Sequence, residues 1–299
     1  MSLNGGKGLV TVLAWAFVLA VSDLPDILFK SLAGRIPAGM FWTKAGILVS
    51  GLALSLVWKK LRALAPFLFI FSVFFVFLGL TSRAGKTAWW IGRFGGPDVS
   101  FTRGYIGIYV LDTIVALAVI AALVIVKRRR PAFFLVKGDT AAPIRPVRWL
   151  GIREGESWKT FGWIFTLAAS AAVAIPTFLA VHPNMAALGK AAALIPAVLL
   201  FAAVNAFNEE IYYRASMLST LADVIGGNRA LLAAALFFGL GHFLYGSPPG
   251  VVGFLMTAFF GWLIGKSMLE TKGFLWPWFM HFVSDVVVFA SYAVAWAGR

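Results

Sequence analysis

The sequence predicts an all-α protein, a polytopic transmembrane helical bundle of about nine spans, or eight if one apolar segment does not cross. Of the 299 residues, 61% are hydrophobic and 13% are charged, whereas a soluble domain of this length needs far more polar surface. The apolar residues form blocks of roughly 17–24, about the length that crosses a ~30 Å hydrocarbon core. A transmembrane β-barrel would instead show ~10-residue segments of alternating polarity.

Nine apolar blocks follow one another along the chain, and we expect each to be one span. The first runs into Ser22-Asp23-Leu24-Pro25 without a small-residue cleavage site, which favours a membrane span over a removed signal peptide. The expected spans, approximate at their ends, are 8–23, 39–58, 64–82, 105–126, 161–181, 190–208, 230–247, 250–268 and 275–297.

The basic residues indicate how these spans are oriented. If the N-terminus is cytoplasmic and the spans alternate, 17 of the 26 Lys and Arg residues fall on the cytoplasmic side and 9 on the other. Because cytoplasmic loops retain positive charge, we predict a cytoplasmic N-terminus and an external C-terminus. The net charge of +14 lies in loops between apolar blocks. It therefore indicates topology and contact with the lipid bilayer, not nucleic-acid binding.

Residues 127–160 form the one long polar connection and divide the chain into regions. The connection opens with Lys127-Arg128-Arg129-Arg130-Pro131, typical of a basic cytoplasmic or interfacial linker; a lipid-headgroup or substrate-docking patch is the alternative. It separates a four-span N-terminal membrane region, 1–126, from a five-span C-terminal membrane domain, 161–299. The chain has no cysteine, which excludes disulfides and thiolate metal sites.

Ionisable residues inside spans are costly and usually functional. Lys44 and Asp112 lie near span ends, where Lys44 can reach the interface and Asp112 a helix partner, so we expect structural roles. We expect Lys190 and Lys266 to be interfacial anchors.

Two adjacent carboxylates, Glu209 and Glu210, differ from these because the helix is expected to continue past them to about Leu221. Glu210 and Arg214 are four residues apart, in the order that favours an ion pair. Glu209 points about 100° away and is therefore free to accept a proton. It shares a stripe that we predict to be the wall of a polar cavity, together with Asn205, Asn208, Tyr212 and Ser216.

Two later spans, 230–247 and 275–297, each carry a histidine at bilayer depth. Phe238 and His242 share one helix face, and so do His281 and Asp285. A single buried histidine is most often a satisfied core residue, but ionisable residues on three separate spans indicate a common site. At 1.5 Å per residue, Glu209, His242 and His281 lie roughly 10–20 Å from the predicted cytoplasmic side. We therefore expect one cavity that opens toward the cytoplasm.

Two mechanisms fit these residue types. In the first, Glu209 and His242 activate a water molecule, while His281 and Asp285 stabilise the developing oxyanion or orient the scissile carbonyl. In the second, Glu209, His242 and His281 bind Zn²⁺, and the metal supplies the nucleophile. The residues leave both open, so the expected cofactor is either none or zinc.

The three segments together resemble the CPBP family of intramembrane proteases (CAAX proteases and bacteriocin-processing enzymes, also called the ABI family). Its type II CAAX prenyl endopeptidases carry EExxxR, FxxxH and HxxxN or HxxxD motifs on successive core helices. Here these motifs run from Glu209 to Arg214, from Phe238 to His242 and from His281 to Asp285. The resemblance covers about 190–290, and it implies a conical cluster of catalytic helices in the C-terminal half.

By this resemblance, Glu209 would be the base, His242 its partner in positioning water, and His281 with Asp285 the oxyanion-stabilising pair. Glu210, Arg214 and Phe238 would support them. The implied function is an intramembrane endopeptidase acting on a membrane-anchored substrate, prenylated or carrying a C-terminal signal. The positive-inside charge, together with the lack of a recognisable eukaryotic sorting signal, favours a prokaryotic plasma membrane. The family is described both as metal-dependent and as metal-free, so zinc stays open here too.

Two other functions compete with proteolysis. A non-proteolytic bacteriocin-immunity or accessory membrane protein would keep the fold without its chemistry. A proton-coupled transporter would also place Glu and His within the membrane, but it should show internal repeats and helices broken at matching positions. The sequence shows no convincing repeat.

Overall fold

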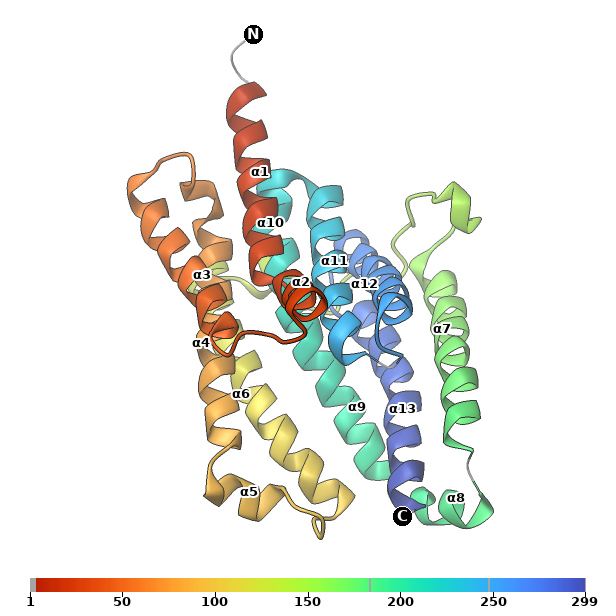
Figure 1. The fold of residues 1–299 in the computed structure, drawn as a ribbon. Coiled ribbons are helices and arrows are strands. Elements are labelled where there is room, and N and C mark those ends of the chain that lie inside the picture. Colours follow the sequence, from red (N-terminus) through yellow and green to blue (C-terminus); the bar gives the residue numbers. More distant parts are fainter. Residues whose placement is uncertain (1–3, 183, 247, 299) are drawn as a thin grey trace.

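The computed structural model describes residues 4–182, 184–246 and 248–298, and these residues form helices and no β-strand (Figure 1). The predicted all-α fold class is therefore confirmed. The α-helices are α1 Asn4–Val21, α2 Leu24–Ala33, α3 Met40–Val57, α4 Ala65–Gly85, α5 Ala88–Phe94, α6 Phe101–Lys127, α7 Trp158–Val181, α8 Met185–Ala192, α9 Ile195–Glu209, α10 Ser216–Ile225, α11 Gly227–Tyr245, α12 Val251–Thr271 and α13 Leu275–Ala297. Short 3₁₀ turns occur at Arg62–Leu64, Arg130–Phe133 and Arg148–Leu150, and a π-helical turn at Glu210–Ala215 joins α9 to α10.

Seven helices of the described chain are long and apolar enough to cross a membrane, namely α3, α4 with its preceding turn, α6, α7, α11, α12 and α13. Two further candidates are bent. α1 and α2 meet at 53°, and α8 meets the continuous helix Ile195–Ile225 at 71°. Counting each bent pair as one span gives nine, so the predicted polytopic bundle is confirmed.

The bend after α1 has a local chemical cause. The Ser22 hydroxyl accepts a hydrogen bond from the Leu24 N–H at 3.2 Å and donates one to the Leu19 carbonyl at 2.8 Å. Pro25 then occupies the first turn of α2, where its missing N–H leaves no broken hydrogen bond. The expected straight span 8–23 is therefore the first arm of a bent pair.

The expected span 190–208 corresponds to a bent pair of helices and not to one straight helix. Lys190 belongs to the short helix α8, which Asn184 caps by accepting a hydrogen bond from the Ala187 N–H at 2.8 Å. The span itself begins at Ile195, with Pro196 in its first turn, and runs without a break to Ile225. The prediction that the helix continues past Glu209 is thus confirmed.

The N-terminal and C-terminal regions share one hydrophobic core. It includes buried residues of α1, α3, α4 and α6 together with residues of α10 and α11. Phe71 of α4 and Phe237 of α11 meet edge to face, with ring centroids 5.5 Å apart. In Figure 1, α9 and α13 run side by side and α7 flanks α13, in agreement with their close contacts. The first four spans therefore help to enclose the helices that carry the motifs.

The linker between α6 and α7 packs closely against the turn between α12 and α13. The Asp139 N–H donates to the Thr271 carbonyl at 2.8 Å, and the Phe274 N–H donates to the Val136 carbonyl at 2.7 Å. Gly138, with φ +76°, lies so close that an added Cβ would be 2.5 Å from Gly273 Cα. Only glycine fits this approach.

Two lysines expected to reach the interface are instead buried, each 5% exposed. Lys266 forms an ion pair with Glu270 and donates a hydrogen bond to the Arg145 carbonyl of the linker. Lys44 forms ion pairs with Asp26 and Asp23 at the bend after α1. Snorkelling is unnecessary where a carboxylate lies within reach of the ammonium group, because a paired charge tolerates burial.

Candidate active site

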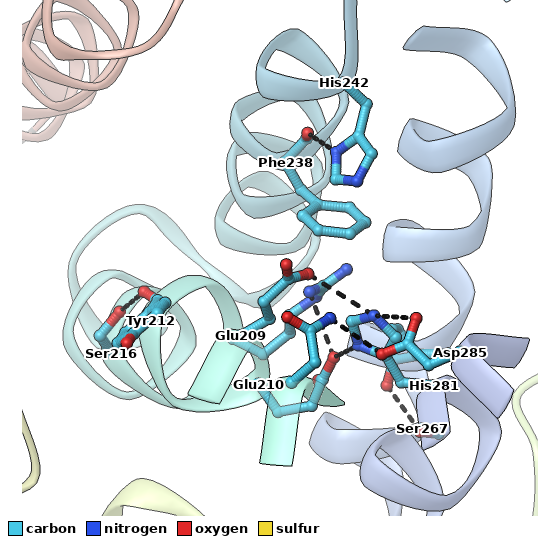
Figure 2. Close-up of polar contacts among 12 residues, drawn as sticks. Glu209, Glu210, Tyr212, Ser216, Phe238, His242, Ser267, His281 and Asp285 are labelled. Carbon is cyan, nitrogen blue, oxygen red and sulfur yellow. Dashed lines mark hydrogen bonds and ion pairs between the residues drawn. The ribbon is translucent and has the colours of Figure 1, made fainter. Parts of the chain in front are cut away.

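The two motif carboxylates lie where the long helix changes from α to π geometry (Figure 2). Glu209 ends α9 and Glu210 begins the π-helical turn. Such widened turns are rare and often occur at functional sites. The turn separates the two acids: the Glu210 side chain is fully buried, whereas that of Glu209 is 23% exposed.

Arg214 is buried beneath the site and neutralises Glu210. Its Nη1 lies 3.2 Å from Glu210 Oε1, as the four-residue spacing predicts, and both side chains are inaccessible to solvent. The guanidinium carbon lies 3.9 Å from the ring centroid of Phe238, within the range of a cation–π interaction. Gly261 of α12 provides the space, since an added Cβ there would lie 2.9 Å from Arg214 Nη2.

His281 on α13 is the hub of the carboxylate cluster. Its Nδ1 lies 2.8 Å from Glu210 Oε1, and its Nε2 lies 3.5 Å from Glu209 Oε2 and 3.7 Å from Asp285 Oδ1. Both ring nitrogens therefore face carboxylate oxygens. Since a carboxylate accepts hydrogen bonds and a protonated imidazole donates from both nitrogens, this geometry orients Glu209.

Asp285 connects the cluster to α9 and α6. Its Oδ2 accepts a hydrogen bond from Asn205 Nδ2 at 2.9 Å. Asn205 Oδ1 accepts in turn from the Tyr109 hydroxyl at 3.2 Å. A polar chain thus runs from α6 through α9 to α13, joining the N-terminal region to the motif residues.

His242, near the end of α11, lies on the other side of Phe238 in Figure 2. Its Nδ1 lies 2.9 Å from the Phe238 carbonyl, which fixes the Nδ1–H tautomer and leaves Nε2 free to act as an acceptor. The rings of Phe238 and His242 are 4.4 Å apart, centroid to centroid. Within the described ranges, no ion pair joins His242 to Glu209.

The predicted residues surround one cavity of about 530 Å³. Glu209, Phe238, His242, His281 and Asp285 line it, while Glu210 and Arg214 lie buried behind it. Most of the other side chains that line the cavity are apolar, and they include three alanines of α7 at positions 168, 169 and 172. The cavity therefore brings a small set of acids and imidazoles to an otherwise apolar chamber, as is typical of ligand pockets.

The predicted polar stripe is only partly correct. Asn205 and Glu209 line the cavity, but Asn208, Tyr212 and Ser216 do not. Asn208 donates to the Thr113 hydroxyl at 3.3 Å, and the Tyr212 hydroxyl donates to the Asp112 carbonyl. Asn208 therefore faces α6. Tyr212 and Ser216 follow the start of the π-helical turn, where the rotation of 100° per residue that the prediction assumed no longer applies.

The zinc alternative requires Glu209, His242 and His281 to converge on one point. Across residues 4–182, 184–246 and 248–298, no three His, Cys, Asp or Glu side chains are placed to hold a metal ion. His281 directs both nitrogens to carboxylates, and His242 directs Nδ1 to a carbonyl. In this arrangement the three side chains do not form a zinc site, although zinc dependence stays a prediction to be tested.

Sequence reasoning did not identify Tyr109, which also lines the cavity. A lone tyrosine in an apolar span carries little information, because packing explains it equally well. Its ring indeed stacks on Phe201, with centroids 5.6 Å apart. The one signal that could have pointed to Tyr109 is that a buried tyrosine hydroxyl needs a hydrogen-bond partner.

Comparison with known protein families gives a match in the C-terminal region of the chain. Residues 191–287 match the family described as type II CAAX prenyl endopeptidase Rce1-like. No curated protein and no solved structure matches the chain. The match covers all three motifs, and with the apolar helices around them it indicates an integral membrane protein of the protease class. Residues 191–287 therefore match the type II CAAX prenyl endopeptidase Rce1-like family, in agreement with the resemblance that the three motifs carry.

Proposed function

We propose that this protein is an intramembrane endopeptidase in which Glu209 activates the water that cleaves the substrate. The observation that carries the proposal is the unequal environment of the adjacent acids. Glu210 is enclosed by Arg214 and His281, whereas Glu209 faces the cavity and has His281 at 3.5 Å as its nearest ion-pair partner. A carboxylate that retains an open face toward a cavity is suited to general-base chemistry.

The reaction is a hydrolysis with a balanced set of proton transfers. Glu209 takes a proton from water as the water oxygen adds to the scissile carbonyl carbon. The protonated Glu209 then gives that proton to the departing nitrogen as the C–N bond breaks, which leaves a new carboxyl group and a new amine. His242, with Nε2 available, holds the water from the opposite side. Among the described residues, Glu209 and His242 form no direct ion pair, and a water molecule can lie between them.

His281 and Asp285 act as orienting residues in this scheme. A direct oxyanion role for His281 would require one of its N–H groups to leave a carboxylate that it now faces. Its geometry is better suited to holding Glu209 in place. Such positioning matters because small displacements of a reactive group lower the rate strongly.

The substrate class we propose is a membrane-associated peptide or protein, including prenylated ones. The cavity lies among helices that could cross a membrane, and its walls are mainly apolar, which suits a substrate that is itself held in the bilayer. The excess of basic residues in the segments predicted to be cytoplasmic supports an opening toward that side.

The test is cleavage of a peptide whose fourth residue from the C-terminus is S-farnesyl cysteine, by purified protein in lipid nanodiscs. We expect Glu209→Ala and His242→Ala each to lower cleavage at least about 10²-fold, with expression intact. Asp223→Ala is the matched control, because Asp223 lies on the same continuous helix with its side chain 85% exposed. Turnover by Glu209→Ala equal to that of wild type would overturn the proposal.

A comparison of membrane peptides in wild-type and Glu209→Ala cells searches for substrates without assuming prenylation. Peptides that accumulate only in the variant are expected, and identical profiles would favour an immunity or accessory role. Metal content and chelator sensitivity of the purified protein decide the cofactor. Stoichiometric zinc that is lost in His281→Ala would replace the metal-free scheme with the zinc scheme.

A further inference from the structure

An oxyanion formed in the cavity needs a hydrogen-bond donor, and most side-chain donors there are already engaged. The Ser284 and Thr257 hydroxyls donate to the Met280 and Gly253 carbonyls. His242 Nδ1 faces a carbonyl, and both nitrogens of His281 face carboxylates. Tyr245 and Tyr292, which are 77% and 42% exposed, lie at the outer edge.

Asn205 is the donor that remains. It lines the cavity and lies one helical turn before Glu209, so the two side chains share a face of α9. The amide has two N–H bonds. One donates to Asp285 Oδ2 at 2.9 Å. No other hydrogen bond from Nδ2 is formed within the described residues, so the second N–H is unengaged beside Glu209.

Two neighbours fix which end of the amide faces the cluster. Asp285 as a carboxylate offers only acceptors, so Asn205 must present its nitrogen there. The Tyr109 hydroxyl donates to Asn205 Oδ1 from the other side, at 3.2 Å. A flipped amide would place Oδ1 against a carboxylate oxygen and would turn its acceptor away from the Tyr109 hydroxyl. Tyr109 and Asp285 therefore hold Asn205 in a single orientation.

We propose that Asn205 is a catalytic residue that donates its free amide N–H to the developing oxyanion, and that Tyr109 is a positioning residue acting through Asn205. The inference rests on the proposed hydrolysis and adds two residues to it. One of them, Tyr109, lies outside the residues that match the Rce1-like family, 191–287. A preorganised donor of this kind is among the largest single contributions to acyl-transfer rates.

The experiment measures kcat and KM for the farnesylated peptide in nanodiscs. We expect Asn205→Ala to lower kcat about 10²–10³-fold with KM unchanged, because the hydrogen bond forms only in the transition state. Asn205→Asp keeps the shape but removes both N–H donors, and we expect it to be at least as inactive. Tyr109→Phe keeps the ring stacking and should lower kcat about 2–10-fold.

The double variant distinguishes positioning from a separate effect. If Tyr109 acts through Asn205, adding Tyr109→Phe to Asn205→Ala should change nothing further. Tyr105→Phe is the matched control, one turn away on α6 and stacked on Phe201 at 5.5 Å without lining the cavity. We expect its kcat to equal that of wild type.

Several results would overturn the inference. Wild-type kcat in Asn205→Ala or Asn205→Asp would show that the donor lies elsewhere, and a raised KM with unchanged kcat would indicate ground-state binding. A further loss of kcat from Tyr109→Phe in the double variant would refute the positioning role. Glu209→Ala separates the two proposals: if it is inactive while Asn205→Ala turns over normally, only the role of Asn205 fails.

Discussion

Two of the charged clusters buried among the helices differ in what their charges face. In the N-terminal cluster, Lys44 is paired with both Asp26 and Asp23. In the site cluster, Glu210, Arg214 and His281 enclose one another, while Glu209 and Asp285 also line the cavity. In both clusters opposite charges are paired, which reduces the cost of burying them. The comparison teaches that acids which themselves line a cavity, more than burial or partial exposure, distinguish the candidate active site, because the Asp23 side chain is also 30% exposed.

We expect the largest loss of stability from a substitution in the fully buried Glu210–Arg214 pair of the site cluster. Arg214→Met leaves Glu210 buried without its cation, and the free energy of unfolding should fall by about 3–5 kcal/mol. Unfolding in mixed detergent micelles measures this loss. The double variant Arg214→Met with Glu210→Gln should recover part of it, because the uncompensated charge is gone. A single Arg214→Met variant as stable as wild type would contradict the role of this pair.

A smaller loss is expected at the N-terminal cluster. Lys44→Met removes charged hydrogen bonds worth about 1.5–3 kcal/mol, moderated because the Asp23 side chain is 30% exposed and can still contact solvent. The same unfolding measurement applies, together with kcat for the farnesylated peptide. We expect kcat per folded molecule to be unchanged. A fall in kcat at full folding would show that the two clusters are coupled, and the comparison drawn above would fail.

The smallest effect concerns Phe238, whose ring lies over Arg214 and beside His242. Phe238→Leu retains an apolar side chain and removes the cation–π interaction, so stability should fall by about 2 kcal/mol or less. Phe237→Leu is the control: its ring packs against Phe71 and Tyr213 instead of the guanidinium. Equal losses of unfolding free energy in the two variants would show that packing alone explains Phe238.

The sequence predicted most helices because hydropathy reports membrane length directly. It also predicted a common site for Glu209, His242, His281 and Asp285 from their spacing on helix faces, and the structure brings these four residues to one cavity. It did not predict the π-helical turn, because a single widened turn does not change the pattern of polar and apolar residues enough to be recognised. Tyr109 was also missed, since its hydrogen bond to Asn205 depends on the contact of α6 with α9, which no local pattern encodes.

The packing of the linker against the turn between α12 and α13 has a consequence for the order of biosynthesis. Asp139 and Val136 find their partners at Thr271 and Phe274, and His281 and Asp285 follow only in α13. A ribosome delivers the chain from its N-terminus, so these contacts form late. The nascent protein therefore holds Glu209 without its neighbour His281 until α13 is inserted. Under the mechanism proposed above, it would stay inactive while it is being made.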